Sequence, residues 1–465
     1  MVVEPIDLAE VLRCPSCRAG GLGLERAGWI CGACSASYPI LGAIPWLFAE
    51  PQSMLAEWRA RLHMAVLELA REAATLRAEL GTPGLGDLTQ ARLELLAAAH
   101  EDHARRLEKL LAPIHIVAPQ ADSKTDETYE TYVALGTRLP HHQGLMNYYV
   151  NVHRDWAWGA AENDAAIASI QAAVPTGYNW GRTLVLGAGA ARLAYDVHMR
   201  FAPSLTAAAD FNPLLLFVAH AVTIGGKVEL YEFPIAPRRL RDHAALRQLT
   251  APAPVRAGFY LLAADALQAP FKPASFDTVL TPWFIDIVDE DLTRFAARVN
   301  GLLRPGGAWI NFGSLAFSEA ERRRRYSVEE AREIIDTAGF SLTEMSEMTI
   351  PYMQSPASRH GRIEMALTWC ARKERSTAPP EEHSTLPEWL LHGDRAVPLI
   401  ENFRVQAVST EILAFLMALI DGQRTVQDMA RVLIDQRLMT PQDAEPAVRR
   451  FLTRMYVESR KRGPY

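Results

Sequence analysis

Residues 183–197, TLVLGAGAARLAYDV, constrain the fold of this 465-residue chain more than any other segment. An apolar run breaks at Gly187, Ala188 and Gly189 and continues with apolar residues at helical spacing, which predicts a strand, a tight turn and a helix. Because glycine has no Cβ, such a turn lets a nucleotide-like ligand lie against the backbone beside the helix N-terminus. NAD and FAD use the same turn, and it can simply pack a strand on a helix, so the turn alone does not choose a ligand.

Two acidic residues further along the chain narrow the choice. Asp210 ends LTAAAD, where a second strand would place a carboxylate on a ribose diol, and Asp265 ends FYLLAAD, where it can meet an adenine amine. SFDTVLTPWFID and LLRPGGAWINFG supply two more strands, a helix and a glycine turn. This order resembles class I S-adenosylmethionine-dependent methyltransferases, which are α/β proteins with a Rossmann-like core. The resemblance implies that Gly187, Gly189, Asp210 and Asp265 bind S-adenosylmethionine.

Four of the five cysteines form two CxxC words. CPSC and CGAC place Cys14, Cys17, Cys31 and Cys34 at a spacing typical of a tetrahedral zinc site. Four thiolates leave no open coordination position, so the predicted Zn²⁺ is structural. The following SASYPILGAIPWLF resembles the zinc ribbon of the small activator subunit of tRNA and translation-factor methyltransferases, over about residues 6–48. We therefore expect a zinc ribbon over 1–50.

A narrower resemblance covers about residues 145–372. RDW ahead of the first strand, GAG-x-x-R-L-A, WFID and PGG-x-W-I-N-F-G occur in this order and look like the carnosine N-methyltransferase family. In that family the Asp286 position contacts an imidazole substrate. A carboxylate that accepts N–H from one ring nitrogen would direct the other nitrogen at the methyl group. The alternative is that Asp286 caps a helix beginning near Val288.

Four further residues are candidates for the cofactor site or the acceptor pocket, and two of them have an alternative role. Arg154 and Arg192 can bind the methionine carboxylate of the cofactor through a planar guanidinium, although Arg154 can instead form an ion pair with Asp155 or Asp164. Asn311 and Tyr352 are candidate catalytic residues at the acceptor pocket, and Asn311 can also serve only to hydrogen-bond a turn. The segment SRHGRIE, residues 358–364, replaces a tyrosine-rich word of the family.

The rest of the chain divides by composition. Helical periodicity over 52–80 and 87–112 predicts a helical brace and loop over 51–140, followed by the methyltransferase over 141–372 and a polar linker over 373–386. Residues 387–465 resemble a PqqD-like module, which clamps a leader peptide as an added strand; short strands are expected first, then helices, the first capped at Ser409. A DNA-binding winged helix is the competing interpretation.

Composition excludes several function classes. The formal net charge of −6 gives no global basic field, so a nucleic acid partner is not expected, and no apolar run is long enough to span a membrane. We expect a cytoplasmic S-adenosylmethionine-dependent N-methyltransferase that acts on a histidine imidazole, in a peptide or a histidine-derived small molecule. The alternatives are an O- or C-methyltransferase of a natural product and a tRNA or translation-factor methyltransferase.

Overall fold

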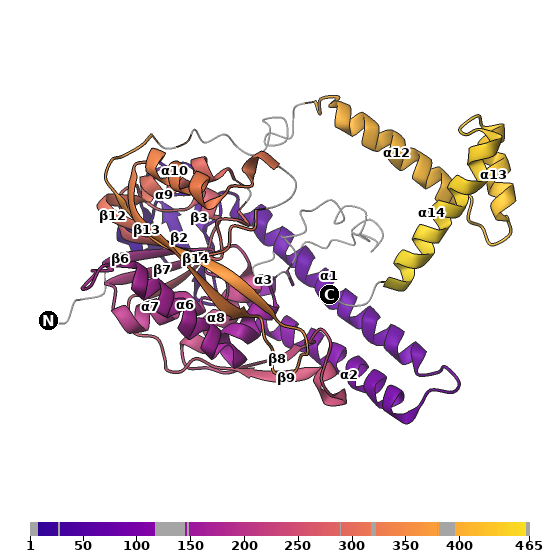
Figure 1. Cartoon of the computed structure of the whole chain (residues 1–465), viewed down its shortest axis with the longest axis horizontal. Coiled ribbons are helices and arrows are strands. Elements are labelled where there is room, and N and C mark those ends of the chain that lie inside the picture. The colour runs from indigo at the N-terminus through magenta and orange to yellow at the C-terminus, as the bar shows by residue number, and fades with distance from the viewer. Residues whose placement is uncertain are drawn as a thin grey trace. The chain divides into compact units, whose positions relative to one another are not determined.

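The computed structural model describes residues 8–26, 28–116, 145–146, 148–288, 290–317, 322–378, 380 and 396–461. The chain forms two compact units, Met1–Pro380 and Glu381–Tyr465. The first unit holds a central sheet with helices on both faces, a zinc-ribbon-like segment and a long helical hairpin (Figure 1).

The central sheet has seven strands: β6 (Arg182–Leu186), β7 (Leu205–Asp210), β10 (Phe259–Ala263), β11 (Phe276–Pro282), β12 (Leu303–Gly313), β13 (Phe340–Tyr352) and β14 (Arg362–Lys373). Their spatial order is β10-β7-β6-β11-β12-β14-β13. The first five are parallel, and β14 is antiparallel to both of its neighbours. The order reverses between β6 and β11, where a Rossmann-like sheet binds its ligand beyond the carboxyl ends of the strands. The predicted Rossmann-like α/β class is confirmed.

Alternation along the strands creates two cores. Val185 packs with α6 (Ala160–Ala173), α7 (Arg192–Phe201) and α8 (Pro213–Thr223), while Leu184 and Leu186 pack on the opposite face with α9 (Leu292–Leu302) and α10 (Val328–Thr337). Successive strand residues point to opposite faces, so a strand buried on both faces is apolar throughout. Figure 1 shows these two groups of helices on opposite sides of the strands.

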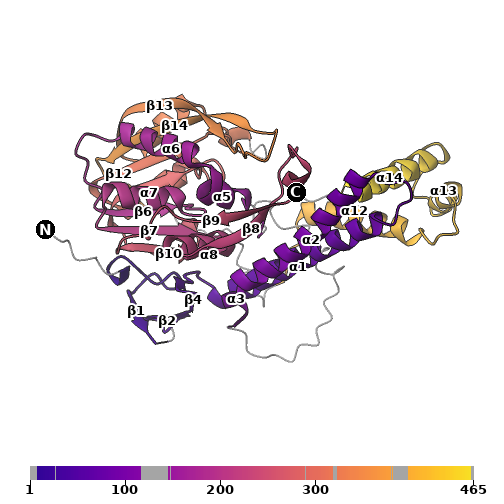
Figure 2. The ribbon, with the colours of Figure 1, turned by 90° about the horizontal axis from the view of Figure 1, so that it is seen from below.

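The N-terminal ribbon covers the edge of this sheet. It contains β1 (Leu22–Glu25), β2 (Gly28–Cys31), β3 (Ser37–Tyr38), β4 (Ile40–Leu41) and β5 (Ile44–Pro45). Leu47 N donates to Ala263 O at 2.8 Å, at the end of edge strand β10, and Lys272 N donates to Val11 O at 2.8 Å. Figure 2 shows β1, β2 and β4 beneath β10. The ribbon therefore holds the chain on both sides of Asp265.

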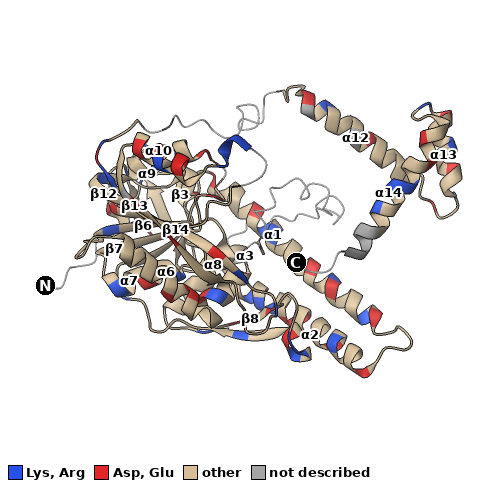
Figure 3. Cartoon of the chain, in the orientation of Figure 1, with Lys and Arg blue, Asp and Glu red and all other residues tan. Residues whose placement is uncertain are grey.

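The predicted helical brace is present in α1 (Pro51–Glu79), α2 (Asp87–Leu110) and α3 (Ala112–Ile116). Trp58 and Leu107 anchor the hairpin in the core, and its far end has a small cluster of its own with Leu76 and Leu93. Basic and acidic side chains are mixed along α1 and α2 (Figure 3). An exposed loop was expected from Pro113 to Asp126, but Pro113–Ile116 belong to α3 and Ile114 is buried, so that start is wrong. Residues 117–140 lie outside the described residues.

The sheet continues into the segment that was expected to be a linker. Lys373 ends β14, is 5% exposed, and donates to Asn300 O and Leu303 O. Thr377 N still donates to Asn300 Oδ1 at 3.2 Å. The core thus extends at least four residues beyond the predicted boundary at 373.

The second unit contains α12 (Glu401–Ala418), α13 (Val426–Asp435) and α14 (Pro441–Lys461) around a core with Leu416, Met429 and Val448. The prediction that the first helix starts at Ser409 is wrong, because α12 begins at Glu401. Thr410 does not cap it, and its hydroxyl donates to Gln406 O one turn back. No strand occurs between residues 396 and 461; the segment 387–395, where strands were also expected, is not described. Among the described helices, none has the length and apolarity to cross a membrane.

Candidate functional site

The glycine turn after β6 is built around Asp210. Gly187, Gly189 and Ala191 all have left-handed backbones, with φ of +66°, +58° and +62°. Gly189 N donates to Asp210 Oδ2 at 2.7 Å, and Asn212 N donates to Oδ1 at 2.8 Å. Burial raises the pKa of Asp210 to about 6, against the effect of these hydrogen bonds. Each carboxylate oxygen has a second lone pair, so the group can still accept hydrogen bonds from a ribose diol.

The backbone of this turn is open at Gly189. A Cβ built on Gly189 would meet nothing within 4 Å, so the backbone here faces open space. Asp265 follows β10 at the same sheet edge, where Oδ1 accepts from Leu267 N at 2.8 Å and burial raises its pKa. The structure therefore brings Gly187, Gly189, Asp210 and Asp265 to the carboxyl ends of three neighbouring strands, as a site for S-adenosylmethionine requires.

Both candidate arginines belong to a buried ionic network beside the turn. Arg154 Nε donates to Asp155 at 2.7 Å and Arg154 Nη1 lies 3.5 Å from Glu162, whereas Arg192 pairs with Asp196 at 2.9 Å. Burial lowers the pKa of Arg154, but the two carboxylates outweigh burial and raise it. The ion pair with Asp155, one of the two readings of Arg154, is thus present.

The RDW segment, Arg154–Trp156, is hydrogen-bonded directly to the glycine turn and to the start of α7. Arg192 Nη1 donates to Asp155 O at 2.7 Å, and Trp156 Nε1 donates to Ala190 O at 2.8 Å. Residues Arg154–Trp158 form a short π-helical turn, a departure from α-helical geometry that recurs at functional sites. The two arginines fix the shape of the site, and their guanidinium groups lie beside it.

Several hydrogen bonds hold the Asp286 carboxylate in place. Ser314 Oγ and Ala316 N, the latter at 3.1 Å, both donate to Oδ2, and the backbone N–H of Asp286 also donates to the carboxylate. Burial raises the pKa of Asp286, which is 9% exposed. The capping alternative is wrong: α9 begins at Leu292 and is capped by Asp291, whose side chain accepts from Thr293 N.

Tyr352 and Asn311 lie in different surroundings. The Tyr352 ring packs on Trp283, with ring centres 4.8 Å apart, and the Arg362 guanidinium lies 4.5 Å from the Tyr352 ring centre. Asn311 is fully buried in the sheet, where its side-chain amide lies 2.9 Å from Thr281 Oγ1. The structure therefore does not bring Asn311 to the surface shared by Tyr352 and Asp286, and its hydrogen bonds serve the sheet.

Sequence reasoning missed two residues of this site. Glu162 pairs with Arg154 and accepts from Met353 N at 2.9 Å, which links the arginine to the segment after Tyr352. Tyr148 lies within electrostatic range of Asp210, Asp286 and Tyr352. Neither stands in a recognisable motif. The adjacent RDW word was the one available signal for both.

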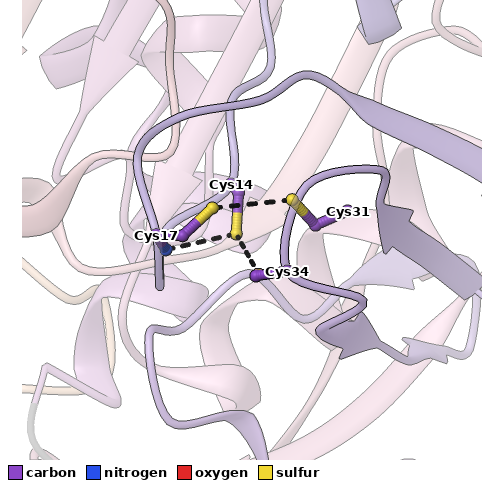
Figure 4. A group of neighbouring side chains, drawn as sticks. All are labelled: Cys14, Cys17, Cys31 and Cys34. Atoms are coloured by element: carbon purple, nitrogen blue, oxygen red, sulfur yellow. Dashed lines mark hydrogen bonds between the residues drawn. The ribbon is translucent and has the colours of Figure 1, made fainter.

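The four cysteines converge in the ribbon (Figure 4). All four sulfur atoms lie within 4.8 Å of one another, and the Cys14–Cys34 and Cys17–Cys31 sulfurs are 3.7 and 3.6 Å apart. A tetrahedron with Zn–S bonds of about 2.3 Å has sulfur separations of about 3.8 Å. The donor set therefore fits a structural zinc ion. Cys370 stands apart on β14.

The model of the carnosine N-methyltransferase family matches residues 143–375. This chain belongs to that family. A relative, the carnosine N-methyltransferase unmet of Drosophila melanogaster, is 25% identical over an alignment of 249 residues that covers 48% of this chain and 53% of the relative. The chain thus spans about half the length of the curated relative that it matches.

Solved methyltransferases align with part of the chain. A phosphoethanolamine N-methyltransferase of Haemonchus contortus, in complex with S-adenosyl-L-methionine, is 17% identical, with a TM-score of 0.30 and coverage of 48% of this chain and 46% of that one. An S-adenosylmethionine-dependent methyltransferase of Mesorhizobium loti is 16% identical, with a TM-score of 0.29 and coverage of 45% and 98%. The strand order itself, and not these scores, assigns the Rossmann-like fold.

Proposed function

We propose that this protein transfers a methyl group from S-adenosylmethionine to a ring nitrogen of a histidine imidazole, in a peptide or a histidine-derived small molecule. The observation that carries the proposal is the buried Asp286 carboxylate, which Ser314 and Ala316 hold in one orientation through hydrogen bonds to Oδ2. Family membership supports N-methylation and makes a histidine-derived acceptor such as carnosine a natural candidate.

The chain would act mainly by positioning. S-adenosylmethionine supplies an electrophilic methyl group, and the reaction is an in-line displacement by a neutral lone pair. Asp210, Asp265 and the glycine turn would hold the cofactor. Asp286 Oδ1 would accept the N–H of the acceptor ring, which selects one tautomer and presents the lone pair of the other nitrogen. The hydrogen bonds from Ser314 and Ala316 keep that carboxylate in one orientation.

The substitution Asp286→Asn tests the proposal. An amide preserves shape but can present either oxygen or NH₂, so we expect methyl transfer to fall about tenfold to a hundredfold, as for loss of a hydrogen bond to a charged group. Affinity for S-adenosylhomocysteine should stay within about twofold, since Asp286 does not hold the cofactor. Labelled cofactor, candidate histidine peptides and dipeptides, and mass spectrometry locate the methyl group. Methyl groups found only on oxygen or carbon, or full activity of Asp286→Asn, would refute the imidazole mechanism.

A separate experiment tests whether the methyl acceptor is a peptide or a small molecule. We propose that the second unit binds a leader peptide, on the strength of its separation from the first unit and its own core. Deleting residues 381–465 should then raise KM for a leader-bearing peptide and leave a histidine dipeptide unaffected, because remote binding is lost while the site is intact. Equal kinetics of the full and shortened chains on the peptide would remove the leader peptide from the proposal.

A further inference from the structure

Tyr148 has a backbone conformation that needs an explanation. Its φ is +60°, in the left-handed region that bulky residues rarely occupy, and its side chain is 43% exposed. This conformation costs about 1–2 kcal/mol in a residue with a Cβ, and a glycine would avoid that cost. Nonglycine residues with such strain are concentrated at ligand sites.

Contacts on both sides of Tyr148 enforce this conformation. Leu145 is buried, and its carbonyl accepts from Asn212 Nδ2 at 3.0 Å, in the turn that follows Asp210. Tyr149 is buried on the other side, and its hydroxyl donates to Tyr231 O at 2.6 Å. Asn151 N donates to Tyr148 O at 2.9 Å. The backbone is therefore held on both sides of Tyr148, next to the turn that follows Asp210.

The neighbours of this side chain come from both halves of the site. Burial raises the pKa of the Tyr148 phenol, and so do the nearby Asp286 and Tyr352, on the acceptor side, and Asp210, at the ribose position. Three further nonglycine residues with left-handed backbones border the same region: Ala191, Trp283 and Met353. Of these four residues, Tyr148 is the one with a phenol, and that phenol lies near both candidate carboxylates.

We propose that Tyr148 is a specificity-determining residue whose ring covers the bound cofactor and whose hydroxyl hydrogen-bonds the methyl acceptor. The inference rests on the proposed function and adds Tyr148 to the residues that line that site. The ring excludes water from the cofactor, and the hydroxyl restricts where the acceptor ring can lie. Both roles depend on the fixed backbone around Tyr148, because in a mobile segment the side chain would turn into solvent.

Substitutions at the two adjacent tyrosines separate this role from a structural one. Tyr148→Gly relieves the backbone strain, so its thermal midpoint should equal or exceed that of the wild type, while its affinity for S-adenosylhomocysteine falls at least about fivefold through loss of the covering ring. Tyr148→Phe keeps the ring, so the affinity should hold while KM for the acceptor rises about threefold to tenfold. Tyr149→Phe is the matched control, and it should lower the thermal midpoint and leave affinity and KM unchanged.

Calorimetric titration with S-adenosylhomocysteine makes the outcome independent of the acceptor. If the wild type binds this probe but methylates no imidazole, the proposed acceptor is wrong, and the loss of affinity in Tyr148→Gly still supports the covering role. Unchanged affinity in Tyr148→Gly would overturn the inference. A thermal midpoint lowered in Tyr148→Gly, with affinity and KM retained, would likewise show that Tyr148 is structural.

Discussion

Phe284 occupies the space in which a side chain on Gly187 would lie. A Cβ built on Gly187 would be 2.1 Å from Phe284 Cδ2, a separation that no real contact reaches. Gly189, two residues on, has a similar φ but open space beside it. The protein itself requires the first glycine, because Phe284 of the WFID segment packs on it, whereas no protein atom crowds the second.

Alanine substitutions should therefore have different effects at the two positions. Gly187→Ala adds overpacking, about 1–3 kcal/mol, to left-handed strain of about 1–2 kcal/mol, so it should lower the free energy of unfolding more than Gly189→Ala, which adds the strain alone. Gly189→Ala should fold and lose affinity for S-adenosylhomocysteine, because its methyl group enters the cofactor space. Urea unfolding and calorimetric titration measure the two effects. Wild-type affinity in Gly189→Ala would place the cofactor elsewhere.

Cofactor affinity should depend on pH through Asp210. The raised pKa, about 6, means that this carboxyl group takes up a proton as pH falls through 6, after which one oxygen can no longer accept freely from a ribose hydroxyl. Affinity for S-adenosylhomocysteine should be constant above pH 7 and decline below pH 6. Titrations between pH 5 and 8 test this, and Asp210→Asn should bind weakly with no such decline. A wild-type affinity that does not vary over this range would contradict the assignment.

Three buried histidines join α2 to the core and should make folding acid-sensitive. Burial lowers the pKa of His100 to about 4 and of His103 and His153 to about 3. Above pH 6.5 these rings are neutral whether the chain is folded or not. Below it the unfolded chain binds protons that the folded chain excludes, so each histidine costs about 1.4 kcal/mol of stability per pH unit.

Urea unfolding at pH 7.5 and 5.5 measures this loss. His100→Leu should reduce the difference between the two pH values by about 1.4 kcal/mol, as one protonation site is removed. His63→Leu is the control, because His63 is exposed on α1. Equal acid sensitivity of the wild type and His100→Leu would show that His100 does not remain neutral in the fold.

Zinc binding should support the cofactor site from a distance. The ribbon holds residues 263–272 through backbone hydrogen bonds at Ala263, Pro270 and Lys272, and Asp265 lies between them. Cys14→Ser should lower the zinc content below one equivalent and speed hydrogen exchange over this segment. Cys370→Ser, outside the ribbon, should do neither. Elemental analysis and exchange mass spectrometry provide the measurements, and full zinc content in Cys14→Ser would refute the Cys₄ site.

Features with a local cause could be predicted from the sequence. The glycine turn, the acid that ends β7, the acid that follows β10 and the two CxxC words are each set by a few consecutive residues. Their positions follow from strand order. The helical hairpin was equally readable, because α1 and α2 repeat apolar residues at helical spacing.

Features that depend on distant contacts could not. Asn311 lies in a segment that resembles the family motif, but its side-chain amide is hydrogen-bonded to Thr281 of the neighbouring strand. This contact depends on the register of β11 and β12, which the sequence does not show. Tyr148 is identified by a backbone conformation that Asn212 and Tyr231 impose from far along the chain. Ser409 and Thr410 suggested a helix start because both residue types favour caps, but the apolar residues before them continue the helix.

The position of the ribbon on β10 has a consequence for solubility. An uncovered edge strand offers unpaired N–H and C=O groups to other chains, which is a common route to aggregation. Trp46 and Leu47 pair with Ala263, the last residue of that edge strand. A chain shortened to begin at residue 51 would expose it together with the apolar surface beneath. Cells short of zinc would face the same hazard with the full-length protein, so metal supply would limit the amount of enzyme that stays dispersed.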